Sequence, residues 1–390
     1  MTEHGTQVDI AVIGAGSMGA MALWQLTEQA AEGTSILGIE KHGRIHTKGS
    51  YSGESRLFRV ALKEGGQYVP LAMEARELWN ELSRRSGRDV FLPIGALNVG
   101  PADLPDILAV REVIAAFDLD HEILDAGRLR AQFPPFDVDD DDIGILDPAG
   151  GGLRPELAVA TAQQLAIDAG AVLWDNTDVT SIEQIGDTVV INSSAGIVEA
   201  RSVIVATGSW TGQLIPELRE HIAVTPIPLT WYLPLDIEAF TPEHLPVFLR
   251  DIVTGDTGFH VYGAPTLDGY SVKISPGVHG HTVDTPDEIP ADLTREELEL
   301  FAEQAGKMVT GIIASPVRVT MHHDGFTPDS SPIIDVLPGT SITVVAGMSG
   351  RGMKFAPAYG RMAAELALTG RARARPDSFT VTHHITPATS

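Results

Sequence analysis

The feature that most constrains this sequence is a glycine-rich turn near its start, Gly14 to Gly19, which reads GAGSMG. A β-branched run, Val8 to Ile13, precedes the turn, and a stretch rich in Ala, Leu and Met, Ala20 to Gln29, follows it. A second apolar run, Ile36 to Ile39, completes the order strand, turn, helix, strand. Such a βαβ unit crosses over with right-handed chirality, so the sequence predicts a parallel sheet with helices on its faces.

The spacing of the three glycines is typical of a dinucleotide-binding turn. Gly14 permits a tight turn, Gly16 lets the backbone approach a pyrophosphate, and Gly19 allows the helix to pack closely on the strand. The helix N-terminus adds N–H donors and a positive dipole for the phosphates. Glu40 ends the second strand, where a carboxylate accepts hydrogen bonds from ribose hydroxyls and disfavours a 2′-phosphate. The pattern therefore predicts FAD or NAD rather than NADP.

Two later segments favour FAD. The strand Val203 to Ala206 ends in Thr207 and Gly208, and a second glycine-rich turn runs from Gly347 to Gly352. An extended cofactor needs backbone contacts from several strand ends, and the late turn would place N–H donors against a flavin ring. Because these pieces are far apart in the sequence, they predict a cofactor domain assembled from separate segments, with another domain inserted.

We therefore predict an α/β fold: a discontinuous Rossmann-like FAD-binding domain with an inserted α+β substrate domain that carries a largely antiparallel sheet. The predicted FAD-binding domain comprises 1–85, 151–215 and 317–390, and the substrate domain comprises 86–150 and 216–316. The stretch from Pro134 to Gly152, with its acidic run Asp139 to Asp142, is interpreted as a linker or a solvated surface loop.

Composition excludes several kinds of site. The chain has 390 residues, of which 27 are basic and 52 acidic, for a formal net charge of −25, and it has no Cys. Disulfides, zinc-thiolate sites, iron-sulfur clusters, a cysteine nucleophile and a cysteinyl cofactor link are therefore impossible, and no metal is predicted. The acidic excess disfavours nucleic acid and anionic membranes as partners. A small-molecule partner, a cytoplasmic location and a monomer or small homo-oligomer are expected.

Longer blocks of sequence resemble a known family. The first glycine-rich turn, Glu40, the block Gly49 to Arg59 (GSYSGESRLFR), the helix start Tyr68 to Leu71 and the segment Gly347 to Phe355 together resemble monomeric sarcosine oxidase, N-methyltryptophan oxidase and the bacterial fructosyl amino acid oxidases. The resemblance runs from about residue 8 to residue 370. It implies a two-domain FAD oxidase that removes hydride from the carbon next to a secondary amine. The imine then hydrolyses, and O2 reoxidises the flavin to give H2O2.

The resemblance also implies roles for four basic residues. Arg59 and Lys354 match the pair that binds the substrate carboxylate, which suits a guanidinium fork and an ammonium converging on one anion. Arg56 matches an arginine that lies against the flavin, and Lys273 matches a lysine that assists oxygen activation. Each residue taken alone is also compatible with a surface salt bridge. The residues predicted to contact the cofactor are Gly14, Gly16, Ser17, Met18, Gly19, Glu40, Lys41, Ser50, Ser55, Arg56, Val179, Thr207, Gly208, Gly347, Gly350, Arg351, Gly352, Met353 and Lys354.

Three positions depart from sarcosine oxidase. His322 stands where that family has a cysteine joined to the flavin, so FAD is predicted to be held without a covalent bond unless a histidine carries it. Arg351 replaces a histidine. Asp324 replaces a pocket tyrosine, and a carboxylate there suits hydroxyls or a cation better than a bare methyl group. This moves the substrate prediction toward a sugar-bearing amine.

Three hypotheses remain open from the sequence. The leading one is an FAD-dependent oxidase of the C–N bond of a secondary amino acid, N-methyl or N-fructosyl, with O2 as acceptor. Its predicted catalytic residues are Lys273, Arg56, Arg59, Lys354 and Asp324. The second is an FAD-dependent amino acid dehydrogenase or primary amino acid oxidase of the same fold. The third, from another class, is a nucleotide-binding regulatory protein that uses only the βαβ unit.

Overall fold

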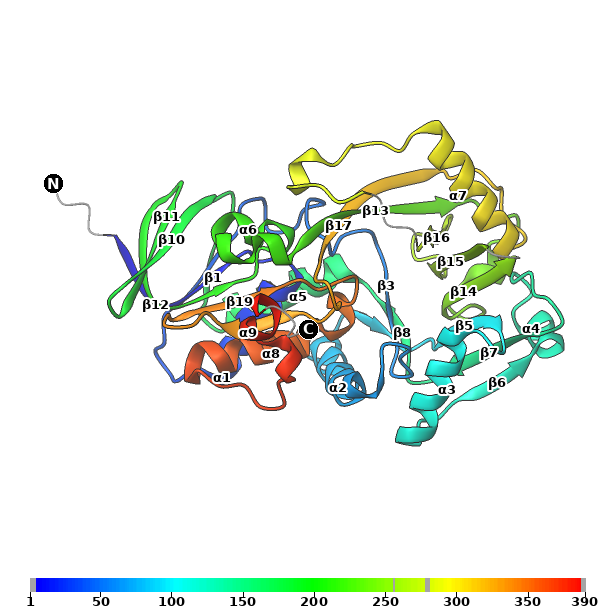
Figure 1. Ribbon diagram of the computed structural model, residues 1–390, viewed down its shortest axis with the longest axis horizontal. Coiled ribbons are helices and arrows are strands. Elements are labelled where there is room, and N and C mark those ends of the chain that lie inside the picture. The colour runs from blue at the N-terminus through cyan, green and yellow to red at the C-terminus, as the bar shows by residue number, and fades with distance from the viewer. Residues whose placement is uncertain (1–4, 255–256, 278–280, 387–390) are drawn as a thin grey trace.

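Two large sheets carry the fold and form the two ends of the molecule in Figure 1, with a small third sheet between them. The computed structural model describes residues 5–254, 257–277 and 281–386 of the chain. Among these residues, no helix combines the length and the apolar character that a membrane crossing requires.

The first sheet contains the predicted βαβ unit. Strand β1 (Thr6–Ile13) leads into helix α1 (Ser17–Gln29), which returns the chain to strand β2 (Ile36–Ile39), parallel to β1. The strand order is β10-β11-β12-β1-β2-β9, and β19 extends the sheet beside the end of β12. Its other strands are β9 (Val172–Trp174), β10 (Val179–Ile185), β11 (Thr188–Ser193), β12 (Gly196–Val205), β18 (Ile333–Val336) and β19 (Ile342–Ala346).

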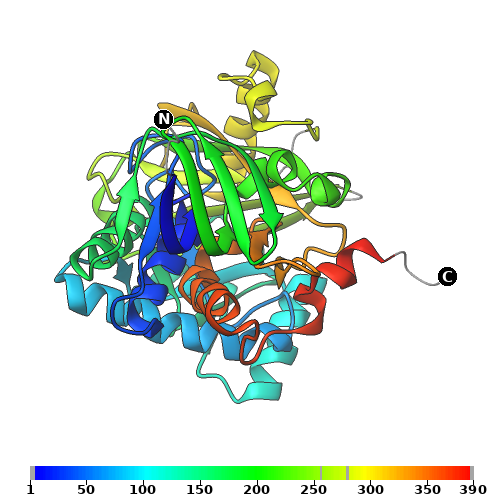
Figure 2. The ribbon, with the colours of Figure 1, turned by 90° about the vertical axis from the view of Figure 1, so that its left-hand side faces the viewer.

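Side-chain alternation along β1 builds a core on each face of this sheet. Ile10 and Val12 join the cluster formed with the covering helices, whereas Ala11 and Ile13 join the cluster on the opposite face. The covering helices are α1, α2 (Val69–Ser86), α5 (Pro155–Asp168) and α8 (Gly352–Thr369). Figure 2 shows blue β1 beside the green strands, with α8 in orange below them.

Helix α8 is held very close to α1. A Cβ atom at Gly360 would lie only 2.5 Å from the backbone carbon of Met21, so only glycine permits this approach. The close packing fixes the position of the first turn of α8, which carries Met353 and Lys354.

The second sheet is largely antiparallel, as predicted. Its order is β17-β13-β16-β15-β14-β5-β7-β6, and in the described part of the chain only β14 and β5 pair in parallel. The strands are β5 (Ala96–Pro101), β6 (Glu122–Asp125), β7 (Asp142–Asp147), β13 (Ala223–Tyr232), β14 (Val247–Thr254), β15 (Thr257–Ala264), β16 (Val272–Pro276) and β17 (Arg318–Phe326). The predicted α/β class with an antiparallel second region is confirmed.

The small sheet joins the two regions. It has the order β3-β8-β4, with β3 (Arg56–Phe58), β8 (Gly151–Leu153) and β4 (Phe91–Leu92). The remaining α-helices are α3 (Pro105–Phe117), α4 (Ala126–Gln132), α6 (Thr211–Leu214), α7 (Arg295–Met308) and α9 (Val381–Ile385), and short 3-10 turns, η1 (Gly66–Tyr68) among them, complete the chain.

The interpretation of Pro134 to Gly152 as a linker or solvated surface loop is only partly right, because Asp139 to Asp141 are exposed but the segment also contains a strand. The segment contains β7, which lies between β5 and β6, and its acidic run ends inside that strand. Asp142 is 2% exposed and accepts a 2.7 Å hydrogen bond from Nη2 of the buried Arg250. A carboxylate paired in this way loses the preference for solvent that the sequence suggests.

The proposed segment 317–390 also contains a strand of the second sheet. Strand β17 lies within that range but pairs with β13 along its whole length. The division into domains itself stays a prediction.

Candidate cofactor and substrate site

A cavity of about 830 Å³ is lined by residues from all three sheets and by the two glycine-rich turns. It brings together most of the residues predicted from the sequence. Those that line it are Gly14, Gly16, Ser17, Met18, Glu40, Lys41, Ser50, Ser55, Arg56, Arg59, Val179, Thr207, Gly208, Asp324, Gly350, Arg351, Gly352, Met353 and Lys354. Gly19, Gly347 and Lys273 are not among the lining residues.

The first glycine-rich turn has the close contacts that only glycine allows. Gly14 has a φ of +84°, and a Cβ atom there would meet the carbonyl oxygen of Ala206 at 2.6 Å. A Cβ atom at Gly19 would lie 1.7 Å from the carbonyl oxygen of Gly14. Gly16 caps α1, with no side-chain cap and no acidic residue in the first turn. The N-terminal N–H groups of α1 are therefore well suited to a pyrophosphate, as FAD binding requires.

Glu40 is poised as a buried acceptor at the end of β2. Its Oε2 accepts a 2.8 Å hydrogen bond from the Ala15 N–H, its Oε1 accepts a 3.0 Å bond from the His42 N–H, and His46 Nε2 lies 3.2 Å from Oε1. Burial acts to raise the pKa of Glu40, but these hydrogen bonds outweigh it and hold the pKa below its usual value. The carboxylate stays ionised and fits the ribose of an adenosine.

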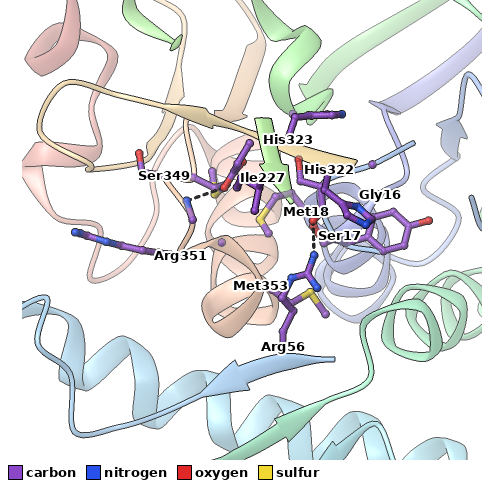
Figure 3. Close-up of a pocket in the computed structure, with 18 of the residues that line it drawn as sticks. Gly16, Ser17, Met18, Arg56, Ile227, His322, His323, Ser349, Arg351 and Met353 are labelled. Atoms are coloured by element: carbon purple, nitrogen blue, oxygen red, sulfur yellow. Dashed lines mark hydrogen bonds between the residues drawn. The ribbon is translucent and has the colours of Figure 1, made fainter. Parts of the chain in front are cut away.

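Arg56 holds together the loop that precedes β3. Its Nη2 donates to the carbonyl oxygens of Ser50 and Ser52, both at 2.7 Å, and its Nη1 donates to that of Ser55 at 2.8 Å. In Figure 3, Arg56 and Met353 lie on the same side of the cavity, and the Arg351 side chain extends away from them. Arg56 thus presents a cation to the cavity while fixing its own loop.

Arg59 and Lys354 converge on one carboxylate, but it belongs to the chain itself. Glu64 Oε1 accepts hydrogen bonds from Lys354 Nζ and, at 3.4 Å, from Arg59 Nη2. The three side chains are 9% exposed or less, and Glu64 Oε2 has no hydrogen-bond partner in the described part of the chain. Arg59 Nη1 also donates to Asn98 Oδ1 at 2.9 Å. The geometry is that of a carboxylate-binding site.

The charges in this group depend on one another. Burial acts to raise the pKa of Glu64, but the ammonium of Lys354 and the guanidinium of Arg59 outweigh it and hold that pKa well below the usual range. Burial lowers the pKa of Lys354 to about 8, although the carboxylate of Glu64 acts in the opposite direction. Glu64 therefore helps to keep Lys354 protonated.

Sequence reasoning missed Glu64, although a signal was present. The residue is followed by two glycines, and the first, Gly65, has a φ of +112°. An acidic residue in such a turn, a few residues after a predicted ligand-binding arginine, is a candidate for an ionic contact with it.

Asp324 lines the cavity, and each of its carboxylate oxygens accepts one backbone hydrogen bond. Oδ1 accepts a 2.8 Å bond from the Gly325 N–H, and Oδ2 accepts a 2.7 Å bond from the Gly350 N–H. Burial raises the pKa of Asp324 to about 6. The two hydrogen bonds tie β17 to the late glycine-rich turn and leave acceptor sites on both oxygens, so the expectation that this carboxylate faces a substituent of the substrate stays a prediction.

Lys273 is buried beside the loop that Arg56 holds. Its Nζ donates to the carbonyl oxygens of Gly53 at 3.1 Å and Ser55 at 2.9 Å, and lies 5.5 Å from the centre of the Trp231 ring. Burial, followed by the charge of Arg56, lowers its pKa well below the usual value. Lys273 is not among the residues that line the cavity, and its role with oxygen stays a prediction.

His322, at the position of the family's flavin-linking cysteine, has partners for both ring nitrogens. Nδ1 lies 3.3 Å from Ser52 Oγ, and Nε2 lies 2.8 Å from Thr320 Oγ1. Burial, with the charges of Arg56 and Lys273, lowers the pKa of His322 to about 3. The ring is neutral and lies on the β17 side of the cavity (Figure 3). Within the described residues, no group of three His, Cys, Asp or Glu could hold a metal ion.

Comparison with solved structures agrees with this fold. The chain superimposes on NikD, described as an unusual amino acid oxidase essential for nikkomycin biosynthesis, with a TM-score of 0.84, 22% identity and coverage of 96% of this chain and 97% of NikD. It also matches L-proline dehydrogenase from P. horikoshii, with a TM-score of 0.82, 20% identity and coverage of 97% of each chain. At these identities the likeness establishes the fold alone.

Sequence comparison is more specific. The chain is 31% identical over 367 residues to monomeric sarcosine oxidase from Streptomyces avermitilis, covering 93% of this chain and 94% of the relative. It is 34% identical over 365 residues to N-methyl-L-tryptophan oxidase from Escherichia coli O81, covering 92% and 94%. Residues 9–366 match the family described as FAD dependent oxidoreductase. The chain therefore belongs to the family of FAD-dependent oxidoreductases (DAO), with FAD as its cofactor.

Proposed function

We propose that this enzyme oxidises the C–N bond of an N-substituted α-amino acid and uses O2 as the acceptor. The observation that carries the proposal is the convergence of Arg59 and Lys354 on a carboxylate at the wall of the cofactor cavity. The two cations and Glu64 leave a net charge of about +1, because Glu64 is ionised and Lys354 is at least partly protonated at neutral pH. The carboxylate of an amino acid would neutralise that charge.

The same cations favour the reactive form of the substrate. Hydride leaves the carbon next to nitrogen only when the amine is neutral, and Arg56, Arg59 and Lys354 all disfavour an ammonium ion near them. Arg56 and Arg59 are separated by Leu57 and Phe58; Arg56 begins β3 and Arg59 directly follows it. When bound, FAD supplies the hydride acceptor and the route of electrons to O2.

The identities of the relatives support the substrate class. Monomeric sarcosine oxidase and N-methyl-L-tryptophan oxidase, as named, act on N-methyl amino acids. The test is a peroxide assay on the holoenzyme with sarcosine, N-methyl-L-tryptophan and N-fructosylglycine. We expect peroxide from at least one of them, and a loss of roughly 100-fold in kcat/KM in the Arg59→Met variant. Arg85→Met, which removes a surface arginine paired with Glu28, is the control.

Flavin loading without peroxide from any secondary amino acid would refute the oxidase proposal. One observation favours a dehydrogenase as the second candidate: the Lys273 ammonium donates to backbone carbonyls and does not line the cavity. In that case substrate would still reduce an artificial electron acceptor while O2 consumption stayed at background. The two acceptors measured in parallel separate these candidates.

We also propose that FAD is held without a covalent bond. The chain has no Cys, and both nitrogens of His322 already have hydrogen-bond partners. Precipitation in acid should release the yellow colour into the supernatant. Colour that stays with the pellet would show a covalent link and would point to a histidine.

A further inference from the structure

The cavity has a polar wall on the side of the second sheet. Strands β14 and β15 pair so that Leu249 lies opposite Tyr262 and Asp251 lies opposite His260. All four residues line the cavity. Side chains alternate along a strand, so these two cross-strand pairs form two successive rows on one face of the sheet.

The two rows lie at different depths. Tyr262 is close enough to Arg56 for that charge to act on its pKa, although burial is the larger influence and raises the pKa. Asp251 and His260 lie one row farther along the strands, roughly 7 Å from Leu249 and Tyr262. Their side chains are 17% and 27% exposed. The first row therefore borders the reacting end of the cavity, and the second row borders its outer part.

The side chains of the second row, Asp251 and His260, are held by contact with each other and with the backbone. His260 Nδ1 lies 2.7 Å from Asp251 Oδ1. The His260 ring also lies over Gly277, where a Cβ atom would meet its Cδ2 at 2.3 Å, and the Gly277 N–H donates to the His260 carbonyl at 2.7 Å. The ring thus occupies the space that a side chain at 277 would need. Its orientation is set from two sides.

This pair has unused hydrogen-bonding capacity. Within residues 5–254, 257–277 and 281–386, no hydrogen bond uses His260 Nε2 or Asp251 Oδ2. A carboxylate oxygen accepts a hydrogen bond, and an imidazole nitrogen donates or accepts one, so the two together match neighbouring hydroxyl groups. Asp324, which the sequence suggested for this task, already accepts one backbone N–H on each oxygen, whereas Asp251 Oδ2 accepts none in the described part of the chain.

We propose that Asp251 and His260 form a specificity site for hydroxyl groups carried by the substrate beyond its reacting amine. The favoured substrates are then polyhydroxylated N-substituted amino acids, because their hydroxyl groups can hydrogen-bond to the pair and a bare N-methyl group cannot. This inference rests on the proposed function, since it takes Arg59 and Lys354 as the anchor of the substrate carboxylate.

A binding experiment tests the site without turnover. The probes are gluconate and hexanoate, six-carbon carboxylates that differ in their hydroxyl groups, titrated into the holoenzyme and followed by the flavin difference spectrum. We expect gluconate to bind roughly 10-fold to 100-fold more tightly than hexanoate. Asp251→Leu and His260→Phe should abolish that preference, and His260→Gln, which keeps a polar group near Nε2, should restore part of it. Acetate binding should stay within about twofold in every variant.

A control and a turnover measurement complete the test. His244→Phe removes a histidine that pairs with Glu238 at the surface and should leave the preference unchanged. The kcat/KM for N-fructosylglycine should fall at least about 10-fold in Asp251→Leu, while that for sarcosine should change less than about twofold. Thermal unfolding checks that each variant is folded.

The outcomes separate this inference from the proposed function. If no N-substituted amino acid is oxidised, the proposed function fails, but the gluconate titration still reports on the site. If wild-type enzyme binds hexanoate as tightly as gluconate, or if Asp251→Leu and His260→Phe keep the preference for gluconate, the hydroxyl site is refuted.

Discussion

Replacing Glu64 by glutamine removes the carboxylate that lies between Arg59 and Lys354 and leaves a neutral side chain of the same size. Lys354 is buried, and without Glu64 its ammonium loses the only carboxylate to which it is hydrogen-bonded in the described part of the chain. Only the protonated lysine can bind a substrate carboxylate by charge. We therefore expect Glu64→Gln to change the pH range in which carboxylates bind.

The geometry sets the size of the change in the pKa of Lys354. Two unit charges about 4 Å apart interact by about 4 kcal/mol at an effective dielectric constant of about 20. We take roughly two thirds of this value to allow for solvent and relaxation. Loss of that interaction in the variant lowers the pKa of Lys354 by about 2. That moves the pKa from about 8 in the wild type to about 6 in the variant.

The sign of the pH dependence is fixed by these values. At pH 8 about half of the wild-type lysine is protonated, against about 1% in the variant, so carboxylate binding weakens about 50-fold. At pH 6 the variant binds the carboxylate only about twofold more weakly than the wild type. Loss of the negative charge of Glu64 strengthens binding by a constant factor at both pH values, so the diagnostic quantity is the ratio between them, about 25-fold.

The assay is calorimetric titration of the holoenzyme with acetate at fixed ionic strength from pH 5.5 to 9.5. Glu74→Gln is the matched control, because Glu74 pairs with the buried Arg361 and does not line the cavity. A midpoint for acetate binding that is the same in wild type and Glu64→Gln would refute the reasoning. So would a midpoint that moves equally in the control.

Three further substitutions give separate tests. Gly19→Ala places a methyl group 1.7 Å from the Gly14 carbonyl oxygen, so we expect purified protein with almost no bound flavin, measured by absorbance. Asp324→Asn loses an acceptor for Gly350, which lowers the unfolding free energy by about 1–3 kcal/mol. Because burial raises the pKa of Asp324 from 3.8 to about 6, the contribution of Asp324 to the unfolding free energy should fall by roughly 2.4 kcal/mol as the pH rises from 4 to 7, and urea unfolding of the variant should lack that decrease. Lys273→Met should slow the reaction of the reduced enzyme with O2 by roughly 100-fold and leave anaerobic flavin reduction nearly unchanged. Stopped-flow traces in which both rates fall by the same factor would mean that Lys273 has a structural role.

Local sequence patterns predicted the cofactor half of the molecule well. The first glycine-rich turn requires specific backbone angles and close contacts, so its spacing predicts both the βαβ unit and the phosphate site. The acidic run at Asp139 to Asp142 shows the opposite case. Only its last residue, Asp142, lies in β7, where it pairs with the buried Arg250, more than a hundred residues away, and no local pattern reveals that pairing.

The substrate side was predicted less well for the same reason. Matching blocks predicted Arg59 and Lys354 as a pair, but Glu64, which lies between them, became visible only when α8 and the turn after β3 were placed together. Asp324 was expected to face the substrate; it lines the cavity, and the backbone N–H groups that each of its oxygens accepts come from residues that the sequence alone does not bring together. The Asp251 and His260 pair depends on the register of β14 and β15, which single-sequence reasoning does not give.

The central claim is that Arg59 and Lys354 anchor the carboxylate of an amino acid whose C–N bond this FAD enzyme oxidises. The most direct measurement compares peroxide release, as kcat/KM, for the best N-substituted amino acid and for the same amine without its carboxylate. Two charge-assisted contacts predict a preference of at least roughly 100-fold for the acid. Equal rates for the two amines, or a faster rate for the amine without a carboxylate, would contradict the account.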